Sequence, residues 1–447
     1  MVIQRGGKVY SLGATSNTHF GPGLGMAGHG VYQMLGGEFT ALGSFHIGGY
    51  SMGAWQQFGG VATFTNYPGS TAGTFDCAAV CNGGWGELYL AGGTANFCKG
   101  FSFGGTWNAV GNQGKVQVNG PTAFLDVHGS KVETNSRSDT GIARLTLSNG
   151  GVMRAAGLVS AKAKSQYPGS VFTVGFDGGV FRCGASGYDI FSADDATHDK
   201  SPNVVSVHTG GITVDTDGKT GNSTGVDLVG ATGGGVQSVP FDPEKDQLEN
   251  GSSGRNLIPP FVSIVGDGQG AAAVALFDLE RGMVTNILMT CPGVGYSVAT
   301  AKLYIAKAAV KSIPCVVAEN PKSGAFTKRG RGDFTLKGTN SWEGATVLEG
   351  GTLVIAGEKA LPAGTTIVPK GGVLEATAEF FPTAMTVDVS GLDPEAPFAP
   401  FARVTSGTLE SEPTFAVVGS DDPNWAVTKV GNTYRAGYRK GTLLILR

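Results

Sequence analysis

The stretch ATVLEGGTLVIA, from Ala345 to Ala356, holds the pattern that decides the fold. It consists of a strand-like run, a Gly-Gly pair and a second strand-like run, whose second residue after the pair is the apolar Leu353. Glycine suits such a corner because it reaches positive φ without strain. The pattern therefore predicts two short strands joined at a glycine corner.

The same unit recurs along the chain at intervals of about 21 to 33 residues. In nine clear cases all but one of the second residues after the Gly-Gly pair are apolar: Val9, Phe39, Ala62, Ala95, Met153, Phe181, Thr213, Leu353 and Leu374. A repeated strand-corner-strand unit is typical of a parallel β-helix, in which stacked turns build the core. We expect Phe39, Met153, Phe181, Leu353 and Leu374 to point into one continuous core. The blades of a β-propeller are longer, about 40–45 residues.

The composition excludes several other classes of protein. Glycine occupies 74 of 447 positions, more than twice the usual share of roughly 7%. It does not recur at every third residue, which excludes collagen, and it disfavours long helices. A net charge of −3 argues against a strongly basic nucleic-acid binder. The longest apolar run, Ala271 to Phe277, is too short to span a membrane as a helix.

Texture divides the chain into three predicted regions. Residues 1–230 form irregular, glycine-rich β-helix rungs. Residues 231–308 form an inserted small β module with a polar loop and four short strands, in which Ala271 to Glu280 is predicted as strand. Residues 309–447 return to regular rungs and end in a β cap. The segment from Lys307 to Lys337 carries seven Lys or Arg residues and is interpreted as a solvated connecting face.

One segment resembles a known repeat. GRGDFTLKGTNSWEGATVLEGGTLVIAGEKALPAGTTIVPKGGVLEA, Gly330 to Ala376, is similar to the autotransporter-associated β-strand repeat, Gly-x-Leu-x-Leu-x-Gly-x-Asn-x-Tyr-x-Gly-x-Thr followed by a gap and Gly-x-Leu. Trp342 replaces the usual Tyr, and Phe334 replaces the first Leu. The matching positions are Leu336, Gly338, Asn340, Gly344, Thr346, Gly351 and Leu353.

This resemblance implies a right-handed β-helix in a secreted or surface-displayed bacterial protein, and it carries no catalytic residue. Gly293, Gly295 and Tyr296 end a stretch that resembles a small β module of large bacterial surface proteins. The closing segment from Phe401 to Arg447 is similar to the C-terminal cap of such proteins. The first residues contain no apolar signal segment, so we expect a fragment of a longer protein or a misassigned start.

Motifs for polysaccharide cleavage are incomplete. The Gly-His-Gly around His29 and the pair Asp194-Asp195 occur in the polygalacturonase family in the opposite order, and their partner motifs are absent. A surface turn explains His29, and a polar loop explains the two aspartates. We therefore assign no catalytic residue.

Metal and cofactor sites are equally weak, and none is assigned. Asp215 and Asp217 lie two residues apart, on one face of a predicted strand, where calcium is an alternative to simple solvation. A polar loop holds four acidic residues that we expect to be solvated: Asp242, Glu244, Asp246 and Glu249. The histidines form no ligand pair at helical spacing: His19, His46, His128, His198 and His208.

Cysteines, aromatic residues and short tripeptides leave alternatives open. The six cysteines are interpreted as buried thiols, with a disulfide among Cys77, Cys81 and Cys98 as the rival: Cys77, Cys81, Cys98, Cys183, Cys291 and Cys315. Most of the larger aromatic residues are expected to stack inward, with a sugar-stacking surface as the alternative: Trp55, Trp85, Tyr89 and Trp107. Arg331-Gly332-Asp333 is interpreted as an ordinary corner, and the sequons at Asn222 and Asn250 support no glycan.

The sequence thus predicts a non-enzymatic, surface-exposed or secreted β-helix passenger with a display or adhesion role. It has no predicted cofactor, nucleic-acid partner or membrane-spanning segment, and glycans or host cell-surface components are the candidate partners. The alternatives are a β-helix that binds or processes polysaccharides and a segment of a phage-tail-like fibre, for which trimer formation would be the sign.

Overall fold

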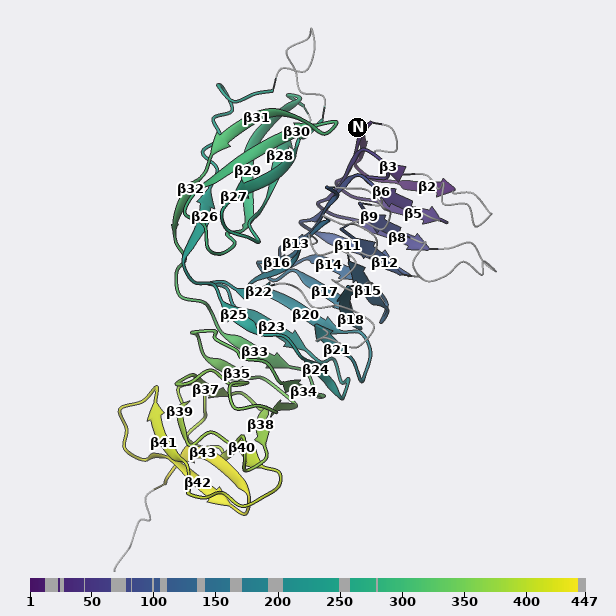
Figure 1. Ribbon diagram of the computed structural model, residues 1–447. Helices are drawn as coiled ribbons and strands as arrows, with labels where there is room; N and C mark the ends of the chain where they lie inside the picture. Colours follow the sequence, from purple (N-terminus) through teal and green to yellow (C-terminus); the bar gives the residue numbers. More distant parts are fainter. Residues whose placement is uncertain are drawn as a thin grey trace, which may run out of the picture.

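The computed structural model describes residues 1–12, 23–24, 28–43, 45–65, 78–81, 83–98, 100–104, 111–134, 141–160, 171–191, 204–248, 258–278 and 280–440. Within these ranges every regular element is a β-strand. Strands of successive turns pair in parallel and build three long sheets, here called A, B and C (Figure 1). The predicted all-β parallel β-helix is therefore confirmed.

The three sheets follow one another around each turn of the β-helix as far as β25. Sheet A contains β1 (Val2–Gln4), β4 (His29–Met34), β7 (Met52–Gln57), β10 (Trp85–Leu90), β13 (Gln113–Asn119), β16 (Ile142–Ser148), β19 (Val171–Asp177), β22 (Val204–Val207) and β25 (Leu228–Gly230). Sheet B contains β2 (Lys8–Leu12), β5 (Glu38–Leu42), β8 (Val61–Thr65), β11 (Gly93–Phe97), β14 (Ala123–Asp126), β17 (Val152–Ala155), β20 (Gly179–Cys183), β23 (Ile212–Asp215), β33 (Phe326–Arg329), β35 (Thr346–Leu348), β37 (Thr366–Pro369), β39 (Ala384–Asp388) and β41 (Thr414–Val418). Sheet C contains β3 (Gly23–Leu24), β6 (Phe45–Ile47), β9 (Ala78–Val80), β12 (Phe101–Phe103), β15 (Lys131–Thr134), β18 (Gly157–Ser160), β21 (Asp189–Phe191), β24 (Asn222–Thr224), β34 (Asp333–Leu336), β36 (Thr352–Ile355), β38 (Val373–Ala376), β40 (Ala399–Val404), β42 (Trp425–Val430) and β43 (Thr433–Tyr438).

The inward side chains of all three sheets form one core along the axis. The five residues predicted to point inward are buried members of this core: Phe39, Met153, Phe181, Leu353 and Leu374. Rings of neighbouring turns stack in it, as Trp55 does on Tyr32 with centroids 4.5 Å apart. Because one rung cannot bury its own inward face, this stacking is the main source of stability.

The rungs directly after the module are shorter than most of those before it. In sheet A, Ala143 of β16 pairs with Phe172 of β19, 29 residues later. In sheet B, Phe326 of β33 pairs with Thr346 of β35, only 20 residues later. Sheet A ends at β25, and residues 337–345 form no strand. The later rungs therefore have two strands each.

A small antiparallel module interrupts the β-helix between β25 and β33. Its strands are β26 (Gly234–Ser238), β27 (Phe261–Gly266), β28 (Ala272–Asp278), β29 (Met283–Cys291), β30 (Ala299–Ile305), β31 (Ala308–Pro314) and β32 (Val316–Glu319). The module has its own apolar core and lies beside sheet A (Figure 1). The strand predicted between Ala271 and Glu280 is β28. Strands β31 and β32 pair with β30 and β26, so the module extends past residue 308.

The last strands of the chain end sheet C. Strand β43 pairs antiparallel with both β40 and β42, which ends sheet C with a hairpin.

The segment from Lys307 to Lys337 is not merely a solvated connection, because it forms strands from β31 to β34. Its Lys328 is fully buried, since the side chain points inward from β33.

Candidate functional site

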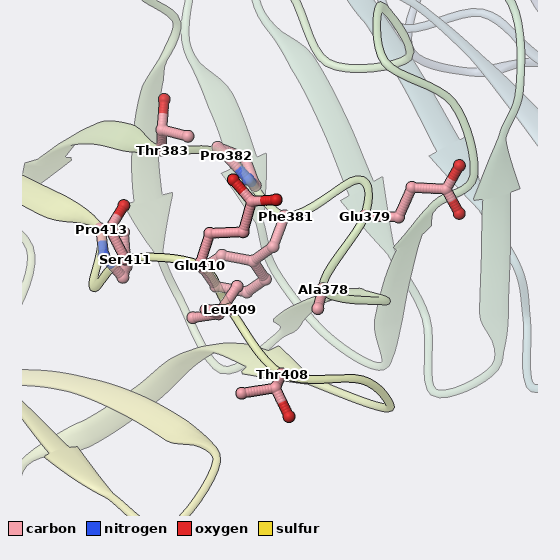
Figure 2. A pocket seen from close by; sticks show the side chains of 10 residues that line it. All are labelled: Ala378, Glu379, Phe381, Pro382, Thr383, Thr408, Leu409, Glu410, Ser411 and Pro413. Atoms are coloured by element: carbon pink, nitrogen blue, oxygen red, sulfur yellow. The ribbon is translucent and has the colours of Figure 1, made fainter.

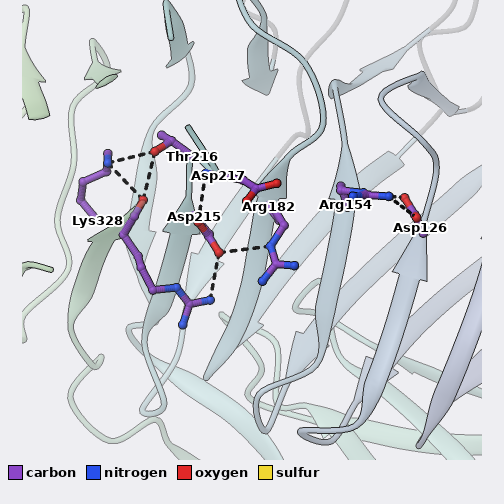
Figure 3. A network of polar contacts seen from close by, with 8 residues as sticks. Asp126, Arg154, Arg182, Asp215, Thr216, Asp217 and Lys328 are labelled. Atoms are coloured by element: carbon purple, nitrogen blue, oxygen red, sulfur yellow. Dashed lines mark hydrogen bonds and ion pairs between the residues drawn. The ribbon is translucent and has the colours of Figure 1, made fainter. Parts of the chain in front are cut away.

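Charged side chains line up at one register position on the outer face of sheet B. Asp126, Arg154, Arg182, Asp215 and Arg329 come from β14, β17, β20, β23 and β33, and each pairs with the next across the strands. Outward positions of a strand alternate with the inward core positions, so regular stacking of the rungs creates this row. We call these five residues the charged ladder; Figure 3 labels Asp126, Arg154, Arg182 and Asp215 and draws their bonds.

The first step of the ladder is a two-point ion pair. The Nε of Arg154 donates to Asp126 Oδ1 at 2.8 Å, and its Nη2 donates to Oδ2. The backbone N–H of His128 also donates to Asp126 Oδ1, at 2.9 Å. Burial alone would raise the pKa of Asp126, but these bonds hold it below its usual value. Asp126 is therefore a firmly ionised acceptor, and the same contact raises the pKa of Arg154.

The second step joins two arginines through one carboxylate. Asp215 Oδ2 accepts a bond from Arg182 Nε at 3.1 Å and another from Arg329 Nη2 at 3.2 Å. Its Oδ1 accepts the backbone N–H of Asp217 at 3.0 Å. Asp215 thus bridges β20 and β33, which lie on either side of β23 although the module separates β23 from β33 in the sequence.

An aromatic ring lies beside the arginines. The guanidinium carbons of Arg154 and Arg182 are 5.7 Å and 5.9 Å from the centroid of Phe124, within the range of a cation–π contact. Arg154 and Arg182 are also direct cross-strand partners. Two like charges in that position repel each other, so the ring and the flanking carboxylates hold together an arrangement that is unfavourable alone.

Behind the ladder, Lys328 places a cation inside the β-helix. Its Nζ donates to Thr216 Oγ1 at 3.1 Å and to the backbone carbonyls of Arg329, Gly330 and Gly350 at 3.1, 2.9 and 2.9 Å. Burial lowers the pKa of Lys328 to about 8. These partners lie at the corner between sheets B and C of the β-helix, so Lys328 stabilises this corner and is not accessible to a ligand.

A second polar cluster joins the module to sheet A. Lys115 Nζ lies 2.6 Å from Glu87 Oε2 and donates to the carbonyls of Val262 at 2.6 Å and Ala273 at 2.9 Å. It also lies 4.1 Å from the ring centroid of Phe261. Burial lowers the pKa of Lys115, and the Glu87 carboxylate opposes that effect. The cluster is a buried structural contact between two sheets.

A serine, a histidine and a cysteine meet at the same interface. His208 Nε2 is 2.9 Å from Ser206 Oγ and 3.3 Å from Cys291 Sγ. Burial lowers the pKa of His208 to about 4 and raises the pKa of Cys291 to about 12. The thiol therefore stays protonated at neutral pH. Because the thiolate is the reactive form of cysteine, this geometry holds the module in place and does not activate a nucleophile.

One open pocket lies in the C-terminal cap. It has a volume of about 480 Å³ and lies between the loop before β39, residues 378–383, and the loop before β41, residues 408–413. Figure 2 shows Phe381 and Leu409 near its centre with Glu410 beside them. The described lining contains no lysine or arginine, so it offers no cation for an acidic substrate, and its titratable groups are the carboxylates of Glu379 and Glu410.

The histidine and the aspartates predicted from sequence lie in different settings. His29 is at the start of β4, and burial together with the chain's amino group lowers its pKa to about 4. Asp194 and Asp195 lie outside the described residues. Asp215 and Asp217 do not share a strand face, because β23 ends at Asp215 and Asp217 has a φ of 48°. The structure gives Asp215 arginine partners instead.

The acidic loop is held by lysines. Lys245 pairs with Asp242 at 2.8 Å, and Lys311 pairs with Asp246 at 2.7 Å. Glu244 donates its backbone N–H to Asp242, while Glu249 lies outside the described part of the chain. Across the described ranges no group of three or more His, Cys, Asp or Glu residues is placed to hold a metal ion.

The remaining sequence candidates are mostly structural. Asp333 of the Arg-Gly-Asp tripeptide accepts the backbone N–H of Gly221, which ties it to the neighbouring turn. Asn222 is fully buried in β24. Of the other histidines, His46 is buried and His128 exposed. Several named candidates lie outside the described residues: His19, His198, Asn250, Cys77 and Trp107.

The described cysteines form no disulfide with one another, and the larger aromatic side chains pack against other residues. Cys81 is buried and Cys98 is half-buried, and neither forms a disulfide with another described residue. Trp55 points into the core, as expected for inward stacking, and Tyr89 is also buried. Trp85 instead packs against the module, with centroid distances of 5.4 Å to Phe261 and 4.6 Å to Tyr304. Cys183 and Cys315 likewise form no disulfide with another described residue.

Sequence reasoning missed the charged ladder, although a signal was present. Arg154 and Arg182 each stand three residues after a Gly-Gly pair, so aligning the repeat units places them at one position. Asp215 stands four residues after its pair, and Arg329 follows no such pair. The full row becomes apparent only from the strand register.

Comparison with known proteins identifies one family match. Residues 326–355 match the model of the family described as passenger-associated-transport-repeat; these residues form β33 to β36. The match confirms the resemblance to autotransporter passenger-type repeat proteins. No curated protein and no solved structure matches the chain. No helix in the described residues is long and apolar enough to cross a membrane.

Proposed function

We propose that this chain is a passenger-type β-helix, secreted or exposed on the bacterial surface, with a role in display or adhesion and no enzymatic activity. The observation that carries the proposal is the passenger-associated-transport-repeat at residues 326–355. This repeat continues sheets B and C directly, since β33 pairs with β23 and β34 pairs with β24. The repeat and the glycine-rich rungs are therefore parts of one β-helix.

An adhesion role is supported by the shape of the molecule. A β-helix presents long, rigid outer faces, and in repeat proteins such extended faces commonly serve as binding surfaces. Here the outer face of sheet B carries the charged ladder, whereas the outer face of sheet A contacts the module. The polar groups buried elsewhere act in packing, which leaves the ladder as the favoured contact surface.

Surface exposure is tested on intact cells that produce the protein from its own gene. Antibodies against the purified chain should label such cells, and protease added from outside should remove the signal while an internal control protein stays intact. Labelling that requires lysis would contradict the proposal. Adhesion is then tested by comparing a deletion strain with its complemented strain; equal attachment would argue against this role.

The absence of enzymatic activity needs a separate test with the purified chain. Pectin, polygalacturonate, alginate and host-type glycans should yield neither new reducing ends nor unsaturated products. Turnover that disappears in His29→Ala or Asp215→Asn would instead support the processing of polysaccharides. The control is Lys245→Gln, which changes an exposed charge on the module.

A further inference from the structure

We propose that Arg154, Arg182 and Arg329 bind a linear anionic polysaccharide that runs along the outer face of sheet B. This inference deepens the proposed adhesion role and rests on it, because it names the ligand class of that surface. The recognised groups are the carboxylates or sulfates of an acidic polymer. The argument depends on the exposure of the arginines, their remaining hydrogen-bond donors, and the shape of the row.

The ladder shows its cations to solvent and hides its anions. The side chains of Arg154, Arg182 and Arg329 are 32%, 31% and 40% exposed. Those of Asp126 and Asp215 are only 4% and 10% exposed. The carboxylates therefore lie beneath the guanidinium groups, and a polymer that approaches sheet B meets three cations first.

The arginines keep donors for a ligand after they bind the aspartates. A guanidinium has five N–H donors. Arg182 directs Nε to Asp215, and Arg329 directs one Nη there, so the other nitrogens of both residues have no acceptor among the described residues. The bonds to the aspartates already fix the orientation of each guanidinium group. This reduces the entropy that is lost when a sulfate or a planar carboxylate binds.

The geometry of the row favours an extended ligand. Arg154 and Arg182 are on adjacent strands, and Arg329 follows after the strand of Asp215. Neighbouring strands lie about 4.8 Å apart, so the cations form a line parallel to the axis of the β-helix. Two neighbouring guanidiniums repel each other, and an acidic group between them would relieve that repulsion.

The surroundings favour a polysaccharide over a nucleic acid. Single-stranded nucleic acids usually need open aromatic platforms on which successive bases stack. In the ladder the aromatic ring is Phe124, and two guanidinium groups already lie beside it. The chain as a whole carries a net charge of −3, so it has no general attraction for polyanions. Binding has to come from this local row.

The test measures binding of the purified full chain to size-defined polymers. One arm uses a sulfated glycosaminoglycan, a second uses polygalacturonate, a third uses neutral dextran, and a fourth uses single-stranded DNA. We expect binding to at least one acidic polysaccharide and none to dextran. Binding to the glycosaminoglycan alone would indicate that sulfate is required, because polygalacturonate carries carboxylates only. Binding should weaken as salt increases, because the contacts are exposed charges.

The decisive variant combines Arg154→Gln, Arg182→Gln and Arg329→Gln, and we expect it to weaken binding roughly tenfold or more. The matched control changes three exposed cations away from sheet B by the same total charge: Lys245→Gln, Arg281→Gln and Lys429→Gln. This control should change affinity less than about twofold, because these charges do not touch the row.

A second variant guards against misfolding. Arg182→Gln alone leaves Asp215 paired with Arg329 and Asp126 paired with Arg154, so the fold should persist, as circular dichroism and thermal melting can verify. It should still weaken binding. Equal affinity of the triple and control variants, stronger binding of DNA than of polysaccharide, or no binding to either acidic polymer would each overturn the inference. Surface labelling of cells with no acidic-polymer binding would refute only this ligand, not the display role.

Discussion

Replacement of Lys115 by methionine should release the module from sheet A. Lys115 Nζ lies 2.6 Å from Glu87 Oε2 and also caps the carbonyls of Val262 and Ala273. Both charged side chains are only 2% exposed. Lys115→Met keeps most of the length of the side chain but leaves a buried carboxylate without its cation. Breaking a buried ion pair from one side costs about 3–5 kcal/mol.

The assay is hydrogen exchange of peptides from β27 and β28, because a β-helix with an inserted module need not unfold in one step. The expected result is faster exchange in the module, with little change in the rungs after β33. Lys115→Met combined with Glu87→Gln should recover at least half of the loss, since no unpaired charge remains. Lys8→Met, which removes an exposed ion pair with Glu38, should leave exchange unchanged. Normal module protection in Lys115→Met would refute the argument.

Further variants test the core of the β-helix, the contact between the module and sheet A, and the dependence of stability on pH. Leu353→Asp should cost several kcal/mol in denaturant unfolding, because it buries an unpaired charge in the continuous core; a tolerant variant would contradict the inward placement. Gly175→Ala should loosen the module by about 1–3 kcal/mol, since a Cβ there would lie 2.5 Å from Cys291 Sγ; Cys291→Ala should suppress the effect in hydrogen exchange. The pKa of His208 is lowered to about 4, so the unfolded chain takes up the proton first on acidification. Stability should therefore fall by about 3 kcal/mol per such histidine between pH 6.5 and pH 4; His208→Gln should remove part of this slope in pH-dependent melting, and His29 should supply a further part.

The sequence was sufficient to predict the β-helix because its repeat is local. Each Gly-Gly corner and the apolar residue two positions later are determined within a single rung, and Leu353 and Leu374 are buried as expected. The extent of the module was harder to predict. Its last strands, β31 and β32, are mostly exposed although their sequences are largely apolar, and β32 pairs with β26, which is distant in sequence.

The charged groups were the least predictable feature. Arg329 and Lys328 are neighbours in the sequence, yet one faces solvent and the other is buried, because successive residues of a strand point to opposite faces. Asp215 and Arg329 are more than one hundred residues apart, and only the stacking of β33 on β23 brings them together. The number of charged residues between Lys307 and Lys337 predicts neither the burial of Lys328 nor the pairing of Arg329 with Asp215.

The passenger-associated-transport-repeat also explains how sheet A ends. Asn340 Oδ1 accepts the backbone N–H of Leu228, in the last strand of sheet A, at 2.8 Å. Its Nδ2 donates to the carbonyl of Ala360, in the following rung, at 2.7 Å. The amide therefore satisfies backbone groups at a place where two strands would otherwise have paired with each other. One asparagine side chain replaces part of a strand ladder.

The aromatic position of the repeat completes this replacement. Trp342 is 2% exposed and stacks on Phe326 with centroids 4.8 Å apart, so its ring occupies core volume that a third strand would have filled. Its Nε1 donates to Thr346 Oγ1 at 3.2 Å, and Thr346 also bonds to Thr365 Oγ1 at 3.0 Å. A buried indole needs such a partner for its N–H. The side chains of Asn340, Trp342 and Thr346 thus form the third side of a rung in place of a strand. This replacement is why successive strands pair after 20 residues in the first rung after the module, compared with 29 residues between β16 and β19.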